Sequence, residues 1–385
     1  MIKRAIGLVT LSALAALAAA CGGGGASDDL REQVVLNYAD GVHELYSRSL
    51  TSARAMDQAI DRFLDDPTGA RLEAAKRAWL VARDDYGPTE AFRFYDGPID
   101  NPDDGPEGLI NAWPLDEAYI DYVEGNPAAG IVAMAGEYPV IDAALLESLN
   151  EQGGEENVST GWHAIEFLLW GQDLSNDGPG DRPIEDYTTN PNAERRATYL
   201  RIASDLLLTH LEGLVDAWAP GRSGNFRADF VAKDVDSALQ DIITGIGELS
   251  RGELAGERMT VAYEERSQED EHSCFSDNTV ADIVGNARGI QMVYTGEYVA
   301  VSGPGIRDLI ESEDSDLAAR LSEQIVRSVA LAKAIQAPFD QHLREGVSDS
   351  SEGRRSVLET IVALETQTDT IVEAAQKIGI SISVS

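Results

Sequence analysis

The chain has 385 residues and carries 67 Asp and Glu against 30 Lys and Arg, which gives a formal net charge of -37 at pH 7. Such a charge repels nucleic-acid phosphates at long range, so it argues against DNA or RNA partners and favours cations. The hydrophobic fraction of 43% is that of a folding globular protein and not of a disordered acidic tail. The length is enough for two or three packed domains.

Residues 1–20 have the features of a cleaved signal peptide. Lys3 and Arg4 precede an apolar stretch that is too short for a transmembrane helix. The stretch ends in Leu-Ala-Ala-Ala-Cys, which resembles the lipobox of bacterial lipoproteins, where cleavage exposes a cysteine for acylation. We therefore expect lipidation of Cys21, a flexible tether over 21–29, and anchorage in the bacterial cell envelope, at the outer membrane facing the periplasm or the surface. A cleaved signal with an incidental cysteine is the alternative.

The rest of the chain reads as a succession of helices. Apolar residues at helical spacing predict helices over 34–64 and 71–86, whereas 87–114 is rich in Pro and Gly and predicts a long functional loop. Further helices are expected at 115–123, 140–149, 158–170, 193–218, 226–249, 253–271, 279–298, 314–345 and 353–378. Since no segment alternates apolar and polar residues over the length of a strand, the pattern predicts an all-α fold of antiparallel helix bundles.

The histidine in the most informative setting is His163, in the segment GWHAIEFLLWGQD. His163 and Glu166 are three residues apart, so on a helix they project from the same face. An imidazole beside a carboxylate can bind one transition metal, and the apolar surroundings predict a buried helix, where a charge needs a partner or a metal. A purely structural His–Glu hydrogen bond explains the same spacing, so both interpretations stay open.

The motif is not a standard zinc-peptidase signature. Those signatures pair two histidines with a glutamate on one helix, as H-E-x-x-H or H-x-x-E-H. Phe167 stands where the second arrangement would need its second histidine. Because a catalytic zinc usually has three protein ligands, the third would have to come from a distant segment.

A second candidate cluster is QEDEHSCFSDNT at 268–279. Glu269, Asp270 and His272 offer oxygen and nitrogen ligands for a hard or borderline cation. A solvated acidic helix end is the plainer interpretation of the same residues. Cys274 is expected to be a buried, inert thiol.

A third candidate region is the irregular stretch 89–117, which mixes aromatic and acidic residues as binding loops often do. Its candidate pocket residues are Glu90, Arg93 and Asp116. The alternative is a loop that packs on the bundle, with Arg93 paired to a carboxylate.

The motif G-x-H-x-x-E around His163 resembles the signature of the imelysin-like proteins. The block at 268–279, together with TEAFRFYDGPID and NAWPLDEAYIDYVEG, is similar to the branch called iron-regulated protein A. The resemblance implies two helical-bundle domains around an interdomain pocket, which we place at 30–190 and 191–385. It also implies a cell-envelope protein associated with iron uptake, and it supports His163 and Glu166 as site residues.

The favoured function is therefore a lipid-anchored envelope protein that binds iron or a small iron-bearing ligand. His163 and Glu166 would ligate the metal, and acids from 89–117 or 269–272 would complete the site. One alternative is an imelysin-type metallopeptidase with zinc. Another is a non-catalytic interaction module in which the His–Glu pair is structural. No catalytic residue is assigned, and an envelope partner protein is left open.

Overall fold

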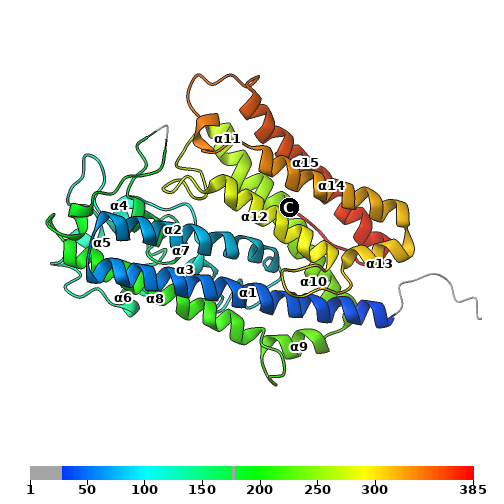
Figure 1. The fold of residues 1–385 in the computed structure, drawn as a ribbon. Coiled ribbons are helices and arrows are strands. Elements are labelled where there is room, and N and C mark those ends of the chain that lie inside the picture. Colours follow the sequence, from blue (N-terminus) through cyan, green and yellow to red (C-terminus); the bar gives the residue numbers. More distant parts are fainter. Residues whose placement is uncertain (1–27, 176–177) are drawn as a thin grey trace, which may run out of the picture.

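The computed structural model describes residues 28–175 and 178–385, and helices dominate both stretches (Figure 1). Within these stretches no strand forms, and β-structure is limited to two isolated bridges, Val123–Asn126 and Glu297–Ser302. The all-α prediction is confirmed. The predicted signal peptide, Cys21 and most of the tether lie outside the described residues. None of the described helices is long and apolar enough to cross a membrane.

The first half is organised around the long helix α1 (Asp28–Asp65), along which α2 (Gly69–Tyr86) folds back. Thr68 caps α2 by accepting a hydrogen bond from the Arg71 amide, and α8 (Ala193–Ala217) packs on α1 and on α7 (Gly161–Trp170). The other elements of this half are short: η1 (Gly87–Phe92), α3 (Glu107–Ile110), α4 (Glu117–Ile120), α5 (Gly130–Ala133), α6 (Ala143–Leu149) and η2 (Ile184–Tyr187).

The second half contains the helical hairpin of α14 (Ser315–Ala334) and α15 (Glu352–Lys377), on the opposite side of the molecule from α8 (Figure 1). Helix α12 (Thr279–Thr295) contacts both α14 and η1, so it connects the hairpin to the first half. The remaining elements are α9 (Phe226–Ala232), α10 (Val235–Glu248), the π-helix η3 (Leu249–Thr260), α11 (Val261–Glu265), α13 (Ile306–Glu313) and η4 (Asp340–His342).

The contact between α12 and η1 is unusually close because both sides present glycine. A Cβ at Gly289 would lie 2.4 Å from the Pro88 carbonyl oxygen, and one at Gly285 would lie 3.2 Å from the Gly87 Cα. Larger residues would push η1 away from the helix. The loop predicted at 87–114 is therefore held at its start by a buried helical turn.

Several expected helices are interrupted or end earlier than the sequence pattern indicates. The segment expected as one helix over 226–249 breaks at residue 234, where Asp234 caps α10. The segment expected over 314–345 stops at Ala334, shortly before Pro338, which cannot continue a helix. The segment expected over 253–271 ends at Glu265, because Arg266 adopts a left-handed conformation with φ of 54°. The acids at 269–271 consequently lie in a loop.

The two-domain division at 190/191 stays a prediction. Helix α8, on the C-terminal side of that boundary, packs on α1 and α7. Buried apolar residues form one cluster that includes members of both predicted halves.

Candidate functional site

Helix α7 is buried over its whole length and carries the G-x-H-x-x-E motif. Its first residue, Gly161, has a φ of 82°, and a Cβ there would lie 2.4 Å from the carbonyl oxygen of Ile110. Any other residue would be strained in that conformation and would also collide with the end of α3. The glycine of the motif thus lets α7 start directly against the loop that carries Trp113.

His163 and Glu166 form a hydrogen-bonded pair and do not stand free as two parallel ligands. The His163 Nδ1 lies 2.9 Å from Glu166 Oε2, and both side chains are fully buried. The other oxygen, Glu166 Oε1, accepts hydrogen bonds from the Ser276 amide at 2.9 Å and from its hydroxyl at 2.7 Å. Both carboxylate oxygens are therefore in use, and Glu166 holds the imidazole in one orientation.

A second imidazole, that of His272, lies against the first. The two ring centroids are 4.7 Å apart, and Trp113 packs on His163 with centroids 4.8 Å apart. The His272 Nδ1 is 3.1 Å from Asp282 Oδ2 and 3.0 Å from an Arg83 guanidinium nitrogen. Among the described residues, the Nε2 atoms of both histidines are buried without a hydrogen-bond partner.

Burial sets the protonation of this cluster. It raises the pKa of Glu166 to about 8, and burial together with the nearby Arg258 lowers the pKa of His272 to about 4. Burial also places the pKa of His163 well below its usual range, with His272 and Arg83 acting in the same direction. For Asp282, burial alone would raise the pKa, but Arg83 holds it below the usual range. Neutral imidazoles are the form that ligates metals.

The lowered pKa of His272 makes the protein sensitive to acid. Between its ordinary value of 6.5 and about 4, the unfolded chain binds a proton that the folded protein does not, so stability is complete above 6.5 and falls as pH falls. At about 1.4 kcal/mol per pH unit, the loss approaches roughly 3 kcal/mol. Because His272→Asn cannot titrate, its free energy of unfolding, measured with urea, should fall less than that of the unchanged protein between pH 7 and pH 4.5. If the free energy of unfolding falls equally with pH in the variant and in the unchanged protein, the lowered pKa is not that of His272.

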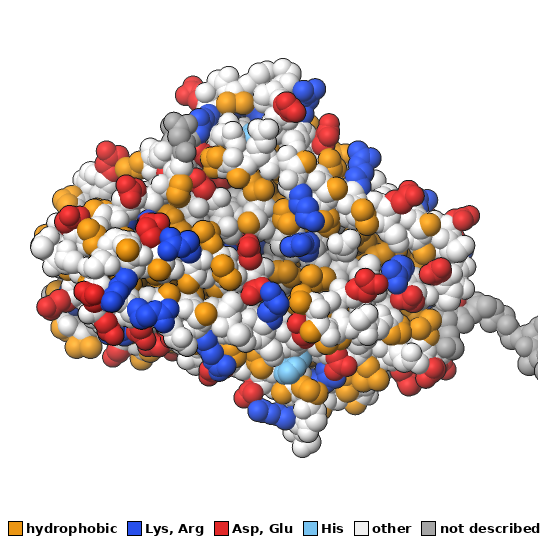
Figure 2. All heavy atoms as spheres, in the orientation of Figure 1, with side chains coloured by type: hydrophobic (Ala, Val, Ile, Leu, Met, Phe, Trp, Pro, Cys, Tyr) orange, Lys and Arg blue, Asp and Glu red, His pale blue; other side chains and the backbone are white. Residues whose placement is uncertain are grey.

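A pocket of about 540 Å³ opens beside this cluster. Six carboxylates and two guanidinium groups share its wall with His272 and Trp113, the charged residues being Glu107, Glu151, Glu155, Glu253, Glu257, Asp270, Arg93 and Arg258. On the face shown in Figure 2, acidic side chains are scattered among Lys and Arg and do not gather in one patch.

The structure brings some of the predicted site residues together and leaves others apart. Arg93, Asp270 and His272 line the pocket. His163 and Glu166 are buried behind that wall, and Glu90 is buried too, bound by Arg258 at 2.6 Å and by Arg93 at 2.9 Å.

Two of the predicted residues lie outside the pocket wall. Asp116 is exposed and caps α4, accepting a hydrogen bond from the Ala118 amide. Glu269 is exposed as well, and it raises the pKa of Glu117, which burial and this charge together bring to about 7.

Sequence reasoning missed Asp282 and Arg258. Asp282 lies on α12, ten residues after His272, and Arg258 comes from the π-helix η3, which no pattern indicated. π-Helical turns are frequent at functional sites, but they have no reliable sequence signal. Arg83 was expected only as part of a helix, whereas it is 1% exposed and donates to Asp282.

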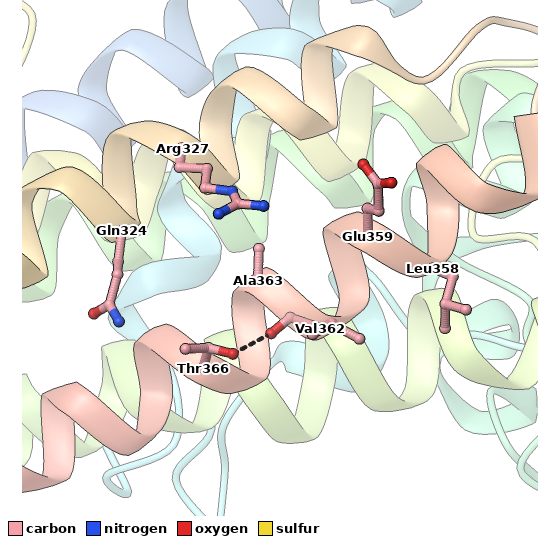
Figure 3. A pocket seen from close by; sticks show the side chains of 7 residues that line it. All are labelled: Gln324, Arg327, Leu358, Glu359, Val362, Ala363 and Thr366. Carbon is pink, nitrogen blue, oxygen red and sulfur yellow. Dashed lines mark hydrogen bonds between the residues drawn. The ribbon is translucent and has the colours of Figure 1, made fainter. Parts of the chain in front are cut away.

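A second hollow lies on the outer surface of α14 and α15 (Figure 3). Leu358, Val362 and Ala363 line it together with Arg327 and Glu359, and it has a volume of about 350 Å³. It contains no histidine, and it shares no residue with the pocket beside His272.

The described residues contain no ready-made metal site of three or more His, Cys, Asp or Glu side chains. This agrees with the hydrogen bonding, because Glu166, Asp282 and Glu90 are all engaged by protein donors. Of the two imidazoles, each keeps its Nε2 without a partner among these residues, and two nitrogens can supply only part of a coordination sphere.

Fold and pocket together define an all-helical protein with a ligand-sized pocket beside two buried histidines. The chain belongs to the imelysin family, whose family model, described as Imelysin and Peptidase_M75, matches residues 42–371. A curated relative, iron-regulated protein A of Synechococcus elongatus, is 26% identical over 380 residues, which is 96% of this chain and 92% of that protein.

Two crystal structures share the fold. One is a candidate iron-regulated protein A precursor from Parabacteroides distasonis, with a TM-score of 0.73 and 21% identity over 91% of this chain and 96% of the other. The second is an imelysin-like protein from Psychrobacter arcticum, with a TM-score of 0.67 and 15% identity over 94% and 99% of the two chains. At these identities the likeness speaks for the fold alone.

Proposed function

We propose that this protein binds iron as cargo, and that the iron arrives carrying ligands of its own. The observation that carries the proposal is the histidine pair: each imidazole has a carboxylate at its Nδ1, and each Nε2 is buried without a partner. The relative's description as iron-regulated supports iron over other metals.

The carboxylates prepare the imidazoles for a metal. A metal-ligating histidine usually donates its other ring N–H to a carboxylate, which fixes the tautomer and raises the basicity of the free nitrogen. Glu166 lies 2.9 Å from His163 Nδ1 and can do this once it is ionised; because burial raises its pKa to about 8, a metal that binds at Nε2 has to displace one proton from the pair. Asp282 lies 3.1 Å from His272 Nδ1 and can do the same in competition with Arg83, which can only donate to that nitrogen and lies 3.0 Å from it. In the tautomers in which Nδ1–H donates, both Nε2 atoms hold a lone pair for a metal. The proposed role of Glu166 is therefore to orient His163, with His272 supplying the second nitrogen.

Two nitrogen donors are too few for a bare iron ion, which takes mixed nitrogen and oxygen ligands in larger number. Waters or an organic chelator therefore supply the remaining donors in this proposal. The pocket volume of about 540 Å³ falls in the range of small-molecule sites. A catalytic zinc usually has three protein ligands, whereas no group of three or more His, Cys, Asp or Glu side chains converges among the described residues.

The cell-envelope location belongs to the same proposal. It rests on the export signal at 1–20 and on Cys21, and cell fractionation is the direct check.

Removing either imidazole tests the function. With ferrous ion and ferric chelates as probes, the unchanged protein should show a rise in Tm, since a ligand at 100 times its Kd stabilises by about 2.7 kcal/mol. His163→Ala and His272→Ala should lose that rise and weaken binding at least tenfold by calorimetry. His210→Ala is the matched control, since His210 pairs with Glu147 away from the pocket.

Two outcomes would overturn the proposal. One is an unchanged Tm of the natural protein with every iron probe. The remaining hypothesis would then be a non-catalytic interaction module in which the His–Glu pair is structural. The other is undiminished iron binding in both histidine variants, which would place the iron elsewhere.

A further inference from the structure

Building on the proposed function, we infer that the pocket selects iron complexes of net positive charge: the hydrated ferrous ion, or a chelate whose organic part leaves a positive charge. Anionic chelates of the carboxylate or catecholate type are excluded from it. The inference rests on how charge is distributed around the pocket and on the histidine in its wall.

The two positive charges of the wall are already neutralised. Arg258 donates to Glu90 at 2.6 Å and to Glu253 at 2.7 Å. Arg93 lies 2.9 Å from Glu90, 3.1 Å from Glu107 and 3.5 Å from Glu253. Because three carboxylates surround two guanidinium groups, no uncompensated positive charge is available for an anionic ligand.

The other four acids of the wall have no recorded Lys or Arg partner within the described part of the chain. They are Glu151, Glu155, Glu257 and Asp270, and they come from three separate segments. Glu151 and Glu155 lie in the turn after α6, Glu257 lies on η3, and Asp270 lies in the loop after α11. Four negative charges around one hollow create a potential that attracts cations and repels anions, beyond the effect of the overall charge.

His272 indicates where in the pocket a ligand atom would bind. It is 2% exposed, it forms part of the pocket wall, and its Nε2 has no hydrogen-bond partner among the described residues. A buried polar atom normally has a partner, so one left over at a pocket indicates a place for a ligand atom. The acids therefore surround a nitrogen donor, which distinguishes this hollow from an ordinary acidic surface.

Two cobalt complexes that keep their own ligands distinguish the effect of a ligand's charge from the effect of coordination by a histidine. Hexaamminecobalt(III) and hexacyanocobaltate(III) are octahedral complexes with charges of about +3 and −3, and neither exchanges ligands readily, so neither needs a free imidazole. The cation should displace bound ferrous ion and bind at least tenfold more tightly than the anion, and its binding should weaken as salt rises.

Variants locate the effect at the pocket. Combining Glu151→Gln, Glu155→Gln, Glu257→Gln and Asp270→Asn should lower the affinity for the cationic probe at least tenfold. The matched control removes the same charge from four exposed acids on α14 and α15, by Glu323→Gln, Glu359→Gln, Glu365→Gln and Asp316→Asn. The control should retain the full selectivity.

Iron itself tells the two cationic sources apart. Ferrous ion in a non-chelating buffer and a cationic ferric trihydroxamate are compared with ferric citrate, an anionic complex. We expect at least one of the two cationic forms to bind at least tenfold more tightly than ferric citrate. The cationic form with the higher affinity is then the form of iron that the pocket takes.

The failure of this inference differs from the failure of the proposed function. If ferric citrate binds as tightly as the cationic forms and still requires His163, the inference is overturned and the function stands. If the quadruple pocket variant and the control respond alike, the selectivity is a property of the whole surface and the inference is wrong.

Discussion

Replacing Glu90 by alanine should destabilise the folded protein by about 3 to 5 kcal/mol, the usual cost of breaking a buried ion pair by removing one partner. Glu90 is 1% exposed and accepts hydrogen bonds from Arg258, Arg93 and Asn111. Burial alone would raise its pKa, but Arg93, Arg258 and Arg83 hold the pKa below the usual range. Without Glu90, the carboxylates recorded beside Arg93 and Arg258 are Glu253 and Glu107.

Urea unfolding of the single variant measures this effect. The control is Glu212→Ala, which breaks the ion pair with Arg54 on the surface, where both side chains are 52% exposed. That change should cost less than about 1 kcal/mol. Equal losses in the two variants would mean that Glu90 does not anchor Arg93 and Arg258 in the pocket wall.

Glu166→Gln should weaken iron binding strongly while leaving the fold almost intact. The backbone N–H of Ser276 donates to Glu166 Oε1, and an amide NH₂ cannot replace that oxygen because two donors would then face each other. The glutamine must therefore turn its oxygen to Ser276 and its NH₂ to His163. The NH₂ donates to Nδ1 and keeps the imidazole proton on Nε2. Glu166, with a pKa of about 8, can give up its proton when a metal binds, but the amide cannot, so the nitrogen that would ligate the metal has no lone pair.

The expected loss of iron affinity is about 10- to 100-fold, as is typical when a group that orients a metal ligand is changed. Urea unfolding should change by no more than about 1.5 kcal/mol, because the hydrogen bonds are kept in number. A ¹⁵N NMR spectrum of the histidine side chains reports the tautomer directly. Full iron affinity in a variant with the Nε2–H tautomer would show that His163 is not a ligand.

The helical class and the position of α7 could be predicted from the sequence because both depend on local patterning. The apolar spacing from Val34 onward gives a helix its buried face whatever it packs on. The three-residue spacing of His163 and Glu166 likewise places them on one face of any helix. The contact between Glu166 and Ser276 joins residues 110 positions apart, and no local pattern contains it.

The composition and order of residues along this chain determined that it would be helical, acidic and furnished with one buried imidazole–carboxylate pair. Only the tertiary structure decided what that pair does. In the folded chain, His163 binds one of the two hydrogen-bonded oxygens of Glu166, and His272 packs against His163. Glu90 is buried in ion pairs with Arg93 and Arg258. The physical reason is that a buried polar group must find its partner wherever the packed chain supplies one, and here α12, η3 and the 266–278 loop supplied them.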